Sequence, residues 1–313
     1  MSLSFIHGAD PNMASYRYRA MIPAALLGAS LNDLTADVLI FAKPTAPDLP
    51  DLLKAKADGK IVIVDCCDVH WQSLDIRTMI EEAHAVVANT PFMAQLLKED
   101  LGIEASIIRD TYEYDERPPH CGGTKLLWFG HPVNAQSLCR VMGLAFTYDF
   151  TAVTRADSVQ NFDAGRVFEW SREVLERELQ RADIVLMPET APHKSNNRTL
   201  EAVRQGCFVI AEPHPSLIGF PGIWIGNILK GILWAQEYPD QANALTAQAQ
   251  AHVRTEYSPE HMVTAWKSLL PGFKSIWAVG ANIGTAGSTS MDNTGARPPM
   301  SLPTSDQCHS TVT

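Results

Sequence analysis

Short apolar runs alternate with amphipathic segments from the start of the chain. The runs ADVLIFAK (36–43) and KIVIVDCCD (60–68) are apolar almost throughout, which is typical of strands buried on both faces of a sheet. Segments 15–29 (SYRYRAMIPAALLGA) and 49–59 (LPDLLKAKADG) have helical spacing instead. The predicted apolar side of the first helix carries Tyr16, Met21, Ala24 and Leu27. Strands separated by helices predict βαβ units and a parallel sheet.

A break in this rhythm divides the chain. Segment 112–125, YEYDERPPHCGGTK, has two Pro and two Gly among charged residues, which is typical of a linker between domains. After it, apolar runs such as KLLWFG and DIVLMP again alternate with helical segments. We therefore predict an α/β fold with two Rossmann-like domains, residues 1–118 and 119–276, whose parallel sheets face a ligand-binding cleft.

The end of the chain has a different composition. Residues 277–313 are rich in Gly, Ser, Thr and Pro and poor in apolar residues, so we predict a disordered tail. Gly280, Gly284 and Gly287 imitate a dinucleotide-binding fingerprint. The strand before it and the helix after it, which that fingerprint requires, are missing from the pattern.

The acidic composition narrows the range of partners. A net charge of −10 repels nucleic-acid phosphates, and no basic stripe offsets it, so we expect no nucleic-acid partner. No apolar run approaches the roughly 20 residues that span a bilayer, and the N-terminus does not resemble a secretory signal. The six Cys include no CxxC pair, which favours reduced thiols. We expect a cytoplasmic protein without a transmembrane segment, and peripheral membrane association stays open.

The stretch PETAPHKSNNRTLEAVRQGCFVIAEP (188–213) is the strongest candidate for chemistry. A polar loop leads into a short helix that Asn196 or Asn197 can cap. The unpaired N–H groups of the first helical turn and the helix dipole favour a phosphate. Lys194 and Arg198 would add charge-assisted hydrogen bonds to that phosphate.

Glu201 lies on the same short helix, where its carboxylate could accept hydrogen bonds from two ribose hydroxyls. A solvated loop followed by an ordinary capped helix, with Glu201 only complementing the dipole, explains these residues equally well. The residue chemistry alone leaves both interpretations open.

The first half of the chain offers a second polar group. VDCCDVHW places Asp65, Asp68 and His70 after a buried strand. A metal site is one interpretation; a sugar or acceptor contact, with His70 moving a proton, is favoured over it. Capping of the turn by Asp65 and Asp68 is the third.

Three further cations lie near predicted strand or helix ends. Arg17 and Arg19 could bind an anionic ligand, although residues two apart do not share a helix face. For Lys43 we favour a solvated side chain over one that points into the cleft.

Several stretches together resemble a known family. ADIVLMPETAPHKSNNRTLEAVRQGCFVIAEP is similar to the donor-binding segment of retaining, nucleotide-sugar-dependent glycosyltransferases of the GT-B type. ASYRYRAMIPAALL resembles their N-terminal Ser-x-Arg-x-Arg stretch, KLLWFGHPVN the first strand and loop of their C-terminal domain, and YSPEHMVTAWKSLL their terminal helix. The resemblance covers nearly everything except the tail.

This resemblance implies transfer of a sugar from a nucleotide-sugar to a glycan or small-molecule acceptor, without a bound metal or other cofactor. It implies an N-terminal acceptor domain and a C-terminal donor domain. The catalytic residues it implies are Lys194, Arg198 and His70. The donor-binding residues are Gly130, His131, Asn134, Asn196, Asn197, Thr199 and Glu201. The acceptor-binding residues are Asp10, Ser15, Arg17 and Asp68.

The sequence departs from the family pattern at two places. His193 stands eight positions before Glu201, where relatives often carry an acidic residue. The segment GHPVNAQ offers His131 and Asn134 where relatives often place Arg and Lys. A catalytically inactive GT-B-like protein that binds a nucleotide or sugar is therefore the alternative hypothesis. A periplasmic-type binding protein is disfavoured.

Overall fold

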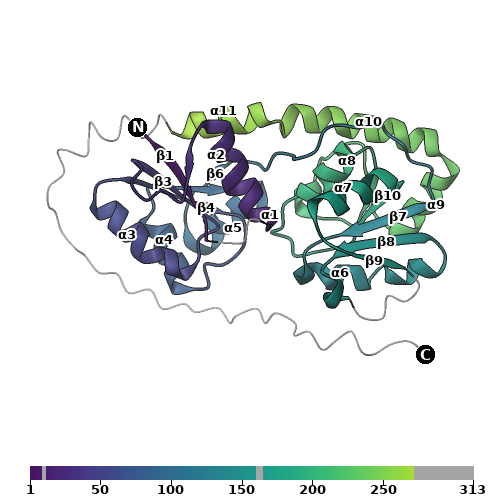
Figure 1. The fold of residues 1–313 in the computed structure, drawn as a ribbon, viewed down its shortest axis with the longest axis horizontal. Helices are drawn as coiled ribbons and strands as arrows, with labels where there is room; N and C mark the ends of the chain where they lie inside the picture. The colour runs from purple at the N-terminus through teal and green to yellow at the C-terminus, as the bar shows by residue number, and fades with distance from the viewer. Residues whose placement is uncertain (9–11, 160–164, 271–313) are drawn as a thin grey trace. The chain divides into compact units, whose positions relative to one another are not determined.

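Two parallel sheets organise the protein, as the buried apolar runs predict. The computed structural model describes residues 1–8, 12–159 and 165–270. The first six-stranded sheet has the order β2-β1-β3-β4-β5-β6 and the second has the order β12-β11-β10-β7-β8-β9 (Figure 1). Neighbouring strands pair in parallel throughout both sheets. The predicted α/β fold class is confirmed.

The strands are short. Those of the first sheet are β1 (Leu3–Ile6), β2 (Ser30–Leu31), β3 (Val38–Ala42), β4 (Ile61–Cys66), β5 (Ala85–Ala88) and β6 (Ser106–Ile107). Those of the second sheet are β7 (Lys125–Phe129), β8 (Asp149–Thr154), β9 (Arg166–Glu169), β10 (Ile184–Met187), β11 (Phe208–Ala211) and β12 (Trp224–Ile225).

The helices occupy the segments between these strands and the end of the described chain. They are α1 (Ala14–Tyr16), α2 (Ile22–Leu27), α3 (Leu49–Ala57), α4 (Leu74–Glu82), α5 (Pro91–Leu101), α6 (Ala135–Cys139), α7 (Arg172–Arg181), α8 (Asn197–Arg204), α9 (Ile228–Glu237), α10 (Pro239–Glu256) and α11 (Pro259–Leu269). A π-helical segment, Arg17–Met21, joins α1 to α2. Short 3-10 segments are Ala46–Asp48, Pro132–Asn134, Met142–Phe146, Ala156–Ser158 and Pro215–Leu217. Among the described residues, no helix is long and apolar enough to cross a bilayer.

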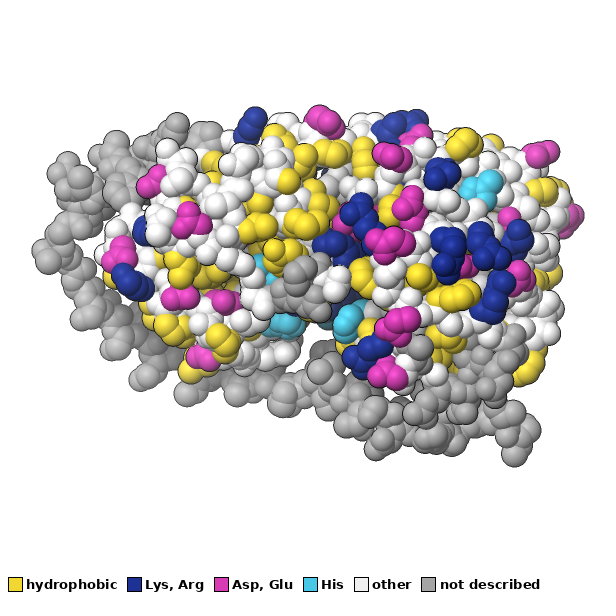
Figure 2. Space-filling view, in the orientation of Figure 1, with side chains coloured by type: hydrophobic (Ala, Val, Ile, Leu, Met, Phe, Trp, Pro, Cys, Tyr) yellow, Lys and Arg dark blue, Asp and Glu magenta, His cyan; other side chains and the backbone are white. Residues whose placement is uncertain are grey.

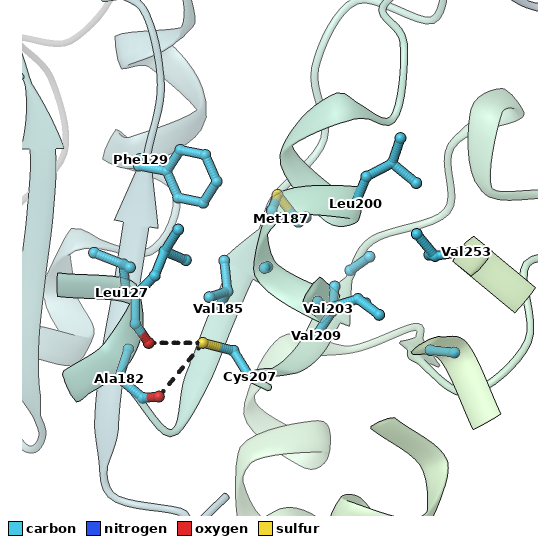
Figure 3. Packing of buried hydrophobic residues seen from close by; sticks show 14 of the residues in the cluster. Leu127, Phe129, Ala182, Val185, Met187, Leu200, Val203, Cys207, Val209 and Val253 are labelled. Carbon is cyan, nitrogen blue, oxygen red and sulfur yellow. Dashed lines mark hydrogen bonds between the residues drawn. The ribbon is translucent and has the colours of Figure 1, made fainter. Parts of the chain in front are cut away.

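Helix α8 is held by an apolar core. Leu200 and Val203 on α8 pack with Val185 of β10 and Val209 of β11 (Figure 3). The Cys207 thiol, fully buried after α8, lies 3.0 Å from the Leu179 carbonyl oxygen. Because this core fixes α8, the polar side chains at its start are held on a rigid element.

The first helical segment buries a different side from the one predicted. The π-helical segment buries Tyr18, Arg19 and Ala20, whereas Tyr16 and Met21 are half-buried. A π-helical turn has more residues than an α-helical turn, so it changes which side chains face the sheet. The predicted apolar side was therefore wrong over this turn.

Arg19 has a structural environment and not the ligand-binding one considered from the sequence. Its guanidinium bonds the Asp65 carboxylate at 2.7 and 2.9 Å and the Asp110 carboxylate at 3.0 Å. These three side chains are almost completely buried. The interpretation of Asp65 as a turn cap is also not supported, because its carboxylate is engaged by Arg19.

An Arg19→Met substitution is expected to lower the free energy of unfolding by about 3–5 kcal/mol, because it leaves two buried carboxylates without their cation. Urea denaturation would measure the change. A triple variant with Asp65→Asn and Asp110→Asn should recover much of the loss, since it removes the unpaired charges. A loss below about 1 kcal/mol in the single variant would contradict the structural role.

The end of the described chain returns to the first sheet. Helix α10 contacts α8, and α11 contacts α2. The Trp266 ring of α11 meets the Phe5 ring of β1 edge to face at 5.3 Å. The predicted domain boundaries at residues 118 and 276 remain predictions. The predicted disordered tail and its three glycines lie outside the described residues.

Candidate functional site

The predicted site residues gather after strands of both sheets. Lys43 follows β3 and Asp68 follows β4, while Gly130 follows β7 and residues 188–196 follow β10. Open parallel sheets bind ligands at this carboxyl edge of their strands. Figure 2 shows histidine and basic side chains close together near the middle of the view.

Glu201 is a buried carboxylate with one free oxygen. Its side chain is 3% exposed. The Oε1 atom accepts hydrogen bonds from the Tyr18 hydroxyl and, at 3.1 Å, from the Glu113 backbone N–H. The Oε2 atom is buried and has no hydrogen-bond partner among the described residues. A buried acceptor without a partner is costly unless a ligand donates to it.

The surroundings of Glu201 change its ionisation. Burial raises the pKa of Glu201 to about 7. Burial and the charge of Glu201 also raise the pKa of Tyr18 well above its usual value, so Tyr18 remains a hydroxyl donor. The carboxyl group of Glu201 therefore changes charge near neutral pH.

Arg198 is a half-buried cation at the start of α8. It donates a hydrogen bond from Nη1 to the Phe129 carbonyl oxygen at 2.9 Å. Among the described residues no carboxylate forms an ion pair with it. Burial lowers the pKa of Arg198 to about 10. An anionic ligand would supply the missing charge.

Gly130 leaves room for this guanidinium. A Cβ atom at Gly130 would lie 3.3 Å from the Arg198 Nη1 atom and 3.1 Å from the Trp128 ring. Such contacts are tighter than ordinary packing allows. The glycine therefore permits the close approach of Arg198 to the end of β7.

Lys194 is already paired with a carboxylate. Its Nζ atom bonds Asp68 Oδ1, and the Lys43 Nζ atom lies 2.8 Å from Asp68 Oδ2. Burial alone would raise the pKa of Asp68, but Lys194 and Lys43 lower it to about 2. The expectation of a solvated Lys43 is wrong, since its side chain is only 18% exposed.

Histidines border this cluster of lysines. The His193 Nε2 atom lies 3.7 Å from Asp68 Oδ1. Burial and the Lys194 charge lower the pKa of His193 to about 4. Burial also lowers the pKa of His70, while burial and the charges of Lys43, Arg155 and Lys194 lower that of His131. At neutral pH these imidazoles carry no charge.

Asn196 and Asn197, at the start of α8, do not cap it as predicted. Asn196 occupies the N-cap position, but its side-chain amide donates to the Tyr257 hydroxyl at 2.9 Å. The Asn197 side-chain oxygen accepts from the adjacent Arg198 N–H at 2.7 Å. Thr199 is buried. The N-cap side chain therefore accepts no hydrogen bond from the backbone N–H groups in the first turn of α8.

His131 and Asn134 lie in the loop after β7. The His131 Nδ1 atom accepts from the Val133 N–H at 3.3 Å, and the Asn134 carbonyl oxygen accepts from the Ser137 hydroxyl at 2.8 Å. Among the described residues, neither side chain forms a hydrogen bond with Lys43, Asp68 or Lys194.

Of the predicted acceptor residues, Asp68 belongs to the lysine cluster. Arg17 bonds both oxygens of the Glu113 carboxylate at 2.9 and 3.0 Å, and its guanidinium lies over the Trp170 ring at 5.1 Å. The Ser15 hydroxyl is buried without a partner among the described residues. Asp10 lies outside the described residues.

Sequence reasoning missed Tyr18 and Glu113 as neighbours of Glu201. Tyr18 belongs to the π-helical segment, and Glu113 lies in the predicted linker. The only signal was the tyrosine-rich stretch SYRYRA. Among the described residues, no group of three or more His, Cys, Asp or Glu side chains is placed to hold a metal ion.

Comparison with known proteins adds structural relatives only. No protein-family model and no curated protein matches the sequence. Solved structures do match. HepE of Anabaena, in complex with UDP and glucose, has a TM-score of 0.71 at 11% identity over 87% of this chain and 100% of that chain. Sucrose-phosphate synthase from Thermosynechococcus elongatus has a TM-score of 0.60 at 11% identity over 89% and 99%.

A third match is a TarM mutant of S. aureus in complex with fondaparinux, alpha-GlcNAc-glycerol and UDP. Its TM-score is 0.60 at 13% identity, over 74% of this chain and 55% of that chain. The similarity to these structures confirms the GT-B fold implied by the sequence resemblance.

Proposed function

We propose that this chain is a glycosyltransferase that moves a sugar from a nucleotide-sugar to an acceptor. The observation that carries the proposal is the buried Oε2 atom of Glu201, which has no partner among the described residues. A ribose hydroxyl is a neutral donor that fits such an acceptor. The complexes of HepE with UDP-glucose and of TarM with UDP support UDP as the nucleotide.

Arg198 and the first turn of α8 would bind the diphosphate. Arg198 is a half-buried cation without a carboxylate partner, and the N–H groups of a helix start favour anions. Gly130 permits the position of this guanidinium beside the end of β7. Glu201, on the same helix, would then hold the ribose and so orient the donor.

The reaction requires stabilisation of the leaving group. The bond between the anomeric carbon and the diphosphate oxygen breaks, and a bond from an acceptor hydroxyl oxygen to that carbon forms. The acceptor proton passes to the leaving diphosphate in the retaining course that the resemblance implies. Arg198 would stabilise the negative charge that develops on the diphosphate, so we expect no need for a metal ion.

On the opposite sheet, Asp68 and His70 would face the acceptor. The pKa of His70 is lowered by burial, so its imidazole is neutral at pH 7 and can accept a hydrogen bond from the acceptor hydroxyl. Lys194 lies in the loop between β10 and α8, and its bond to Asp68 would connect that loop to the residues that face the acceptor.

The test is a donor screen with the purified chain. Calorimetric titration with UDP and GDP measures binding, and release of UDP from UDP-hexoses measures turnover, with and without EDTA. We expect UDP to bind with a Kd of about 1 μM–1 mM, and slow UDP-sugar hydrolysis that EDTA does not change. If UDP binds but no UDP-sugar is turned over with any acceptor tried, the chain is the inactive nucleotide-binding protein instead.

The ionisation of Glu201 links donor binding to pH. Its pKa is about 7 without ligand, and only the ionised carboxylate is a strong acceptor for a hydroxyl. The Kd for UDP should therefore fall about tenfold as the pH rises from about 6 to about 8. Glu201→Gln is the matched control, because any change of the Kd with pH that remains in this variant comes from the ionisation of UDP itself. An equal change of the Kd with pH in the wild type and in Glu201→Gln would contradict the role of Glu201 ionisation.

A further inference from the structure

The lysine cluster, which we define as Lys43, Asp68 and Lys194, has an excess of positive charge. A single carboxylate serves both ammonium groups, one on each oxygen. Two lysines and one aspartate leave a formal charge of +1. The neighbouring His70 and His193 add no charge to the cluster, since their pKa values are lowered and both are neutral at pH 7.

The backbone at Lys43 is strained. Its φ is +51°, in the left-handed region that side chains with a Cβ atom rarely adopt. Its N–H is held by the Asp65 carbonyl oxygen at 2.9 Å. Asn32 is the other non-glycine residue with positive φ in the described ranges, and asparagine tolerates this conformation better than lysine. Strain of this kind concentrates at ligand-binding sites.

The cluster can be reached by a ligand. The Lys43 and Lys194 side chains are 18% and 32% exposed, whereas the Asp68 side chain is 8% exposed. An incoming anion could therefore contact both ammonium groups while Asp68 stays in place. Each ammonium group has three donors, so its bond to Asp68 leaves further donors available.

We propose that the lysine cluster binds a phosphoryl group carried by the acceptor. This inference rests on the proposed function, since the phosphoryl group belongs to the acceptor of that transfer. Lys43 and Asp68 follow strands of the first sheet, whereas Arg198 and Glu201 lie on α8 beside the second sheet. Lys194 joins Lys43 and Asp68 from the loop between β10 and α8. None of these three side chains is among the groups assigned in the proposed function to the diphosphate or the ribose.

The number of hydrogen-bond donors around the lysine cluster favours a phosphoryl group over a carboxylate. A phosphoryl group has three charged oxygens and a charge near −2, while a carboxylate has two oxygens and a charge of −1. Besides the two ammonium groups, the imidazoles of His70 and His193 each offer one N–H. The Asp68 carboxylate already accepts from one N–H of each ammonium group, so the remaining donors are available to a second anion.

Inorganic phosphate is the probe, titrated by calorimetry into protein already saturated with UDP, which fills the donor site. We expect binding, and we expect Lys43→Met to weaken it by at least about tenfold. Lys230→Met, at an exposed position on α9, is the matched control and should leave binding unchanged. Asp68→Asn should strengthen phosphate binding, because it removes the competing carboxylate. Partial unfolding of the variant would weaken phosphate binding and so could not produce this increase.

Three results would overturn the proposal. They are no phosphate binding to the UDP-saturated protein, equal effects of Lys43→Met and Lys230→Met, and acetate binding as tight as phosphate binding. If UDP binds but phosphate does not, the proposed function stands and this inference fails. If UDP does not bind, the proposed function fails, and phosphate binding to the free protein that depends on Lys43 would still support the phosphoryl site.

Discussion

Replacing Glu201 by glutamine is expected to raise the Kd for UDP about 10- to 100-fold. The amide keeps the shape of the side chain and can still accept from the Tyr18 hydroxyl and the Glu113 N–H. It replaces the buried oxygen that has no partner among the described residues by an NH2 group, which donates hydrogen bonds and cannot accept them. A ribose hydroxyl then loses a charge-assisted hydrogen bond in a buried environment. Isothermal titration calorimetry at about pH 8, where Glu201 is ionised, would measure the difference.

The matched ligand is 2′,3′-dideoxy-UDP, which lacks both ribose hydroxyls. Wild-type protein and Glu201→Gln should bind it equally, because this ligand has no ribose hydroxyl that could donate a hydrogen bond to residue 201. Glu260→Gln, at an exposed position of α11, controls for the loss of one negative charge. If Glu201→Gln weakens the dideoxy ligand as much as UDP, Glu201 acts on the fold of the site and not on the ribose.

The sheets could be predicted because their central strands are buried on both faces. Such strands appear in the sequence as uninterrupted apolar runs, as in β3 and β4, where each residue is buried. The edge strands β2 and β12 have only two residues each, which is too short for any pattern to indicate a strand. Strand β9 has four residues with no buried one, so it resembles a loop.

The candidate site was predictable only where its residues are close in sequence. Arg198 and Glu201 share α8, and their helix follows a loop rich in polar residues. The Tyr18–Glu201 bond joins residues 183 apart, and the Lys194–Asp68 bond joins residues 126 apart. Such pairs depend on how two sheets pack, and no periodicity within a segment contains that information.

Two errors in the predictions have the same kind of cause. Lys43 was expected in solvent because lysine is usually exposed, but the carboxylate of Asp68 stabilises it in a partly buried position. Asn196 or Asn197 was expected to cap α8 because asparagine favours N-caps. The amide of Asn196, at the N-cap position, instead bonds the Tyr257 hydroxyl, which lies 61 residues away in sequence. In both cases a distant partner changed the preference of the residue.

Replacing Arg198 by methionine is expected to lower kcat/KM for the nucleotide-sugar by about 10²–10³-fold. Arg198 is the half-buried cation proposed to face the leaving diphosphate, and loss of one preorganised donor of this kind has an effect of that size. Release of UDP from the UDP-sugar that proves active would measure it. Arg198→Lys should retain part of the rate, because it keeps a charge but loses the planar fork.

The stability of the same variant distinguishes a functional role from a structural one. Burial lowers the pKa of Arg198 to about 10, which means that the folded protein disfavours the charged side chain when no anion is bound. Arg198→Met should therefore melt at the same temperature as the wild type or higher, while Arg19→Met should melt lower, because Arg19 forms ion pairs with two buried carboxylates. UDP should raise the melting temperature of the wild type more than that of Arg198→Met, since a ligand stabilises only the state it binds. A lower melting temperature together with an unchanged rate would make Arg198 a structural residue, because the charge at the start of α8 would then serve packing and not the leaving group.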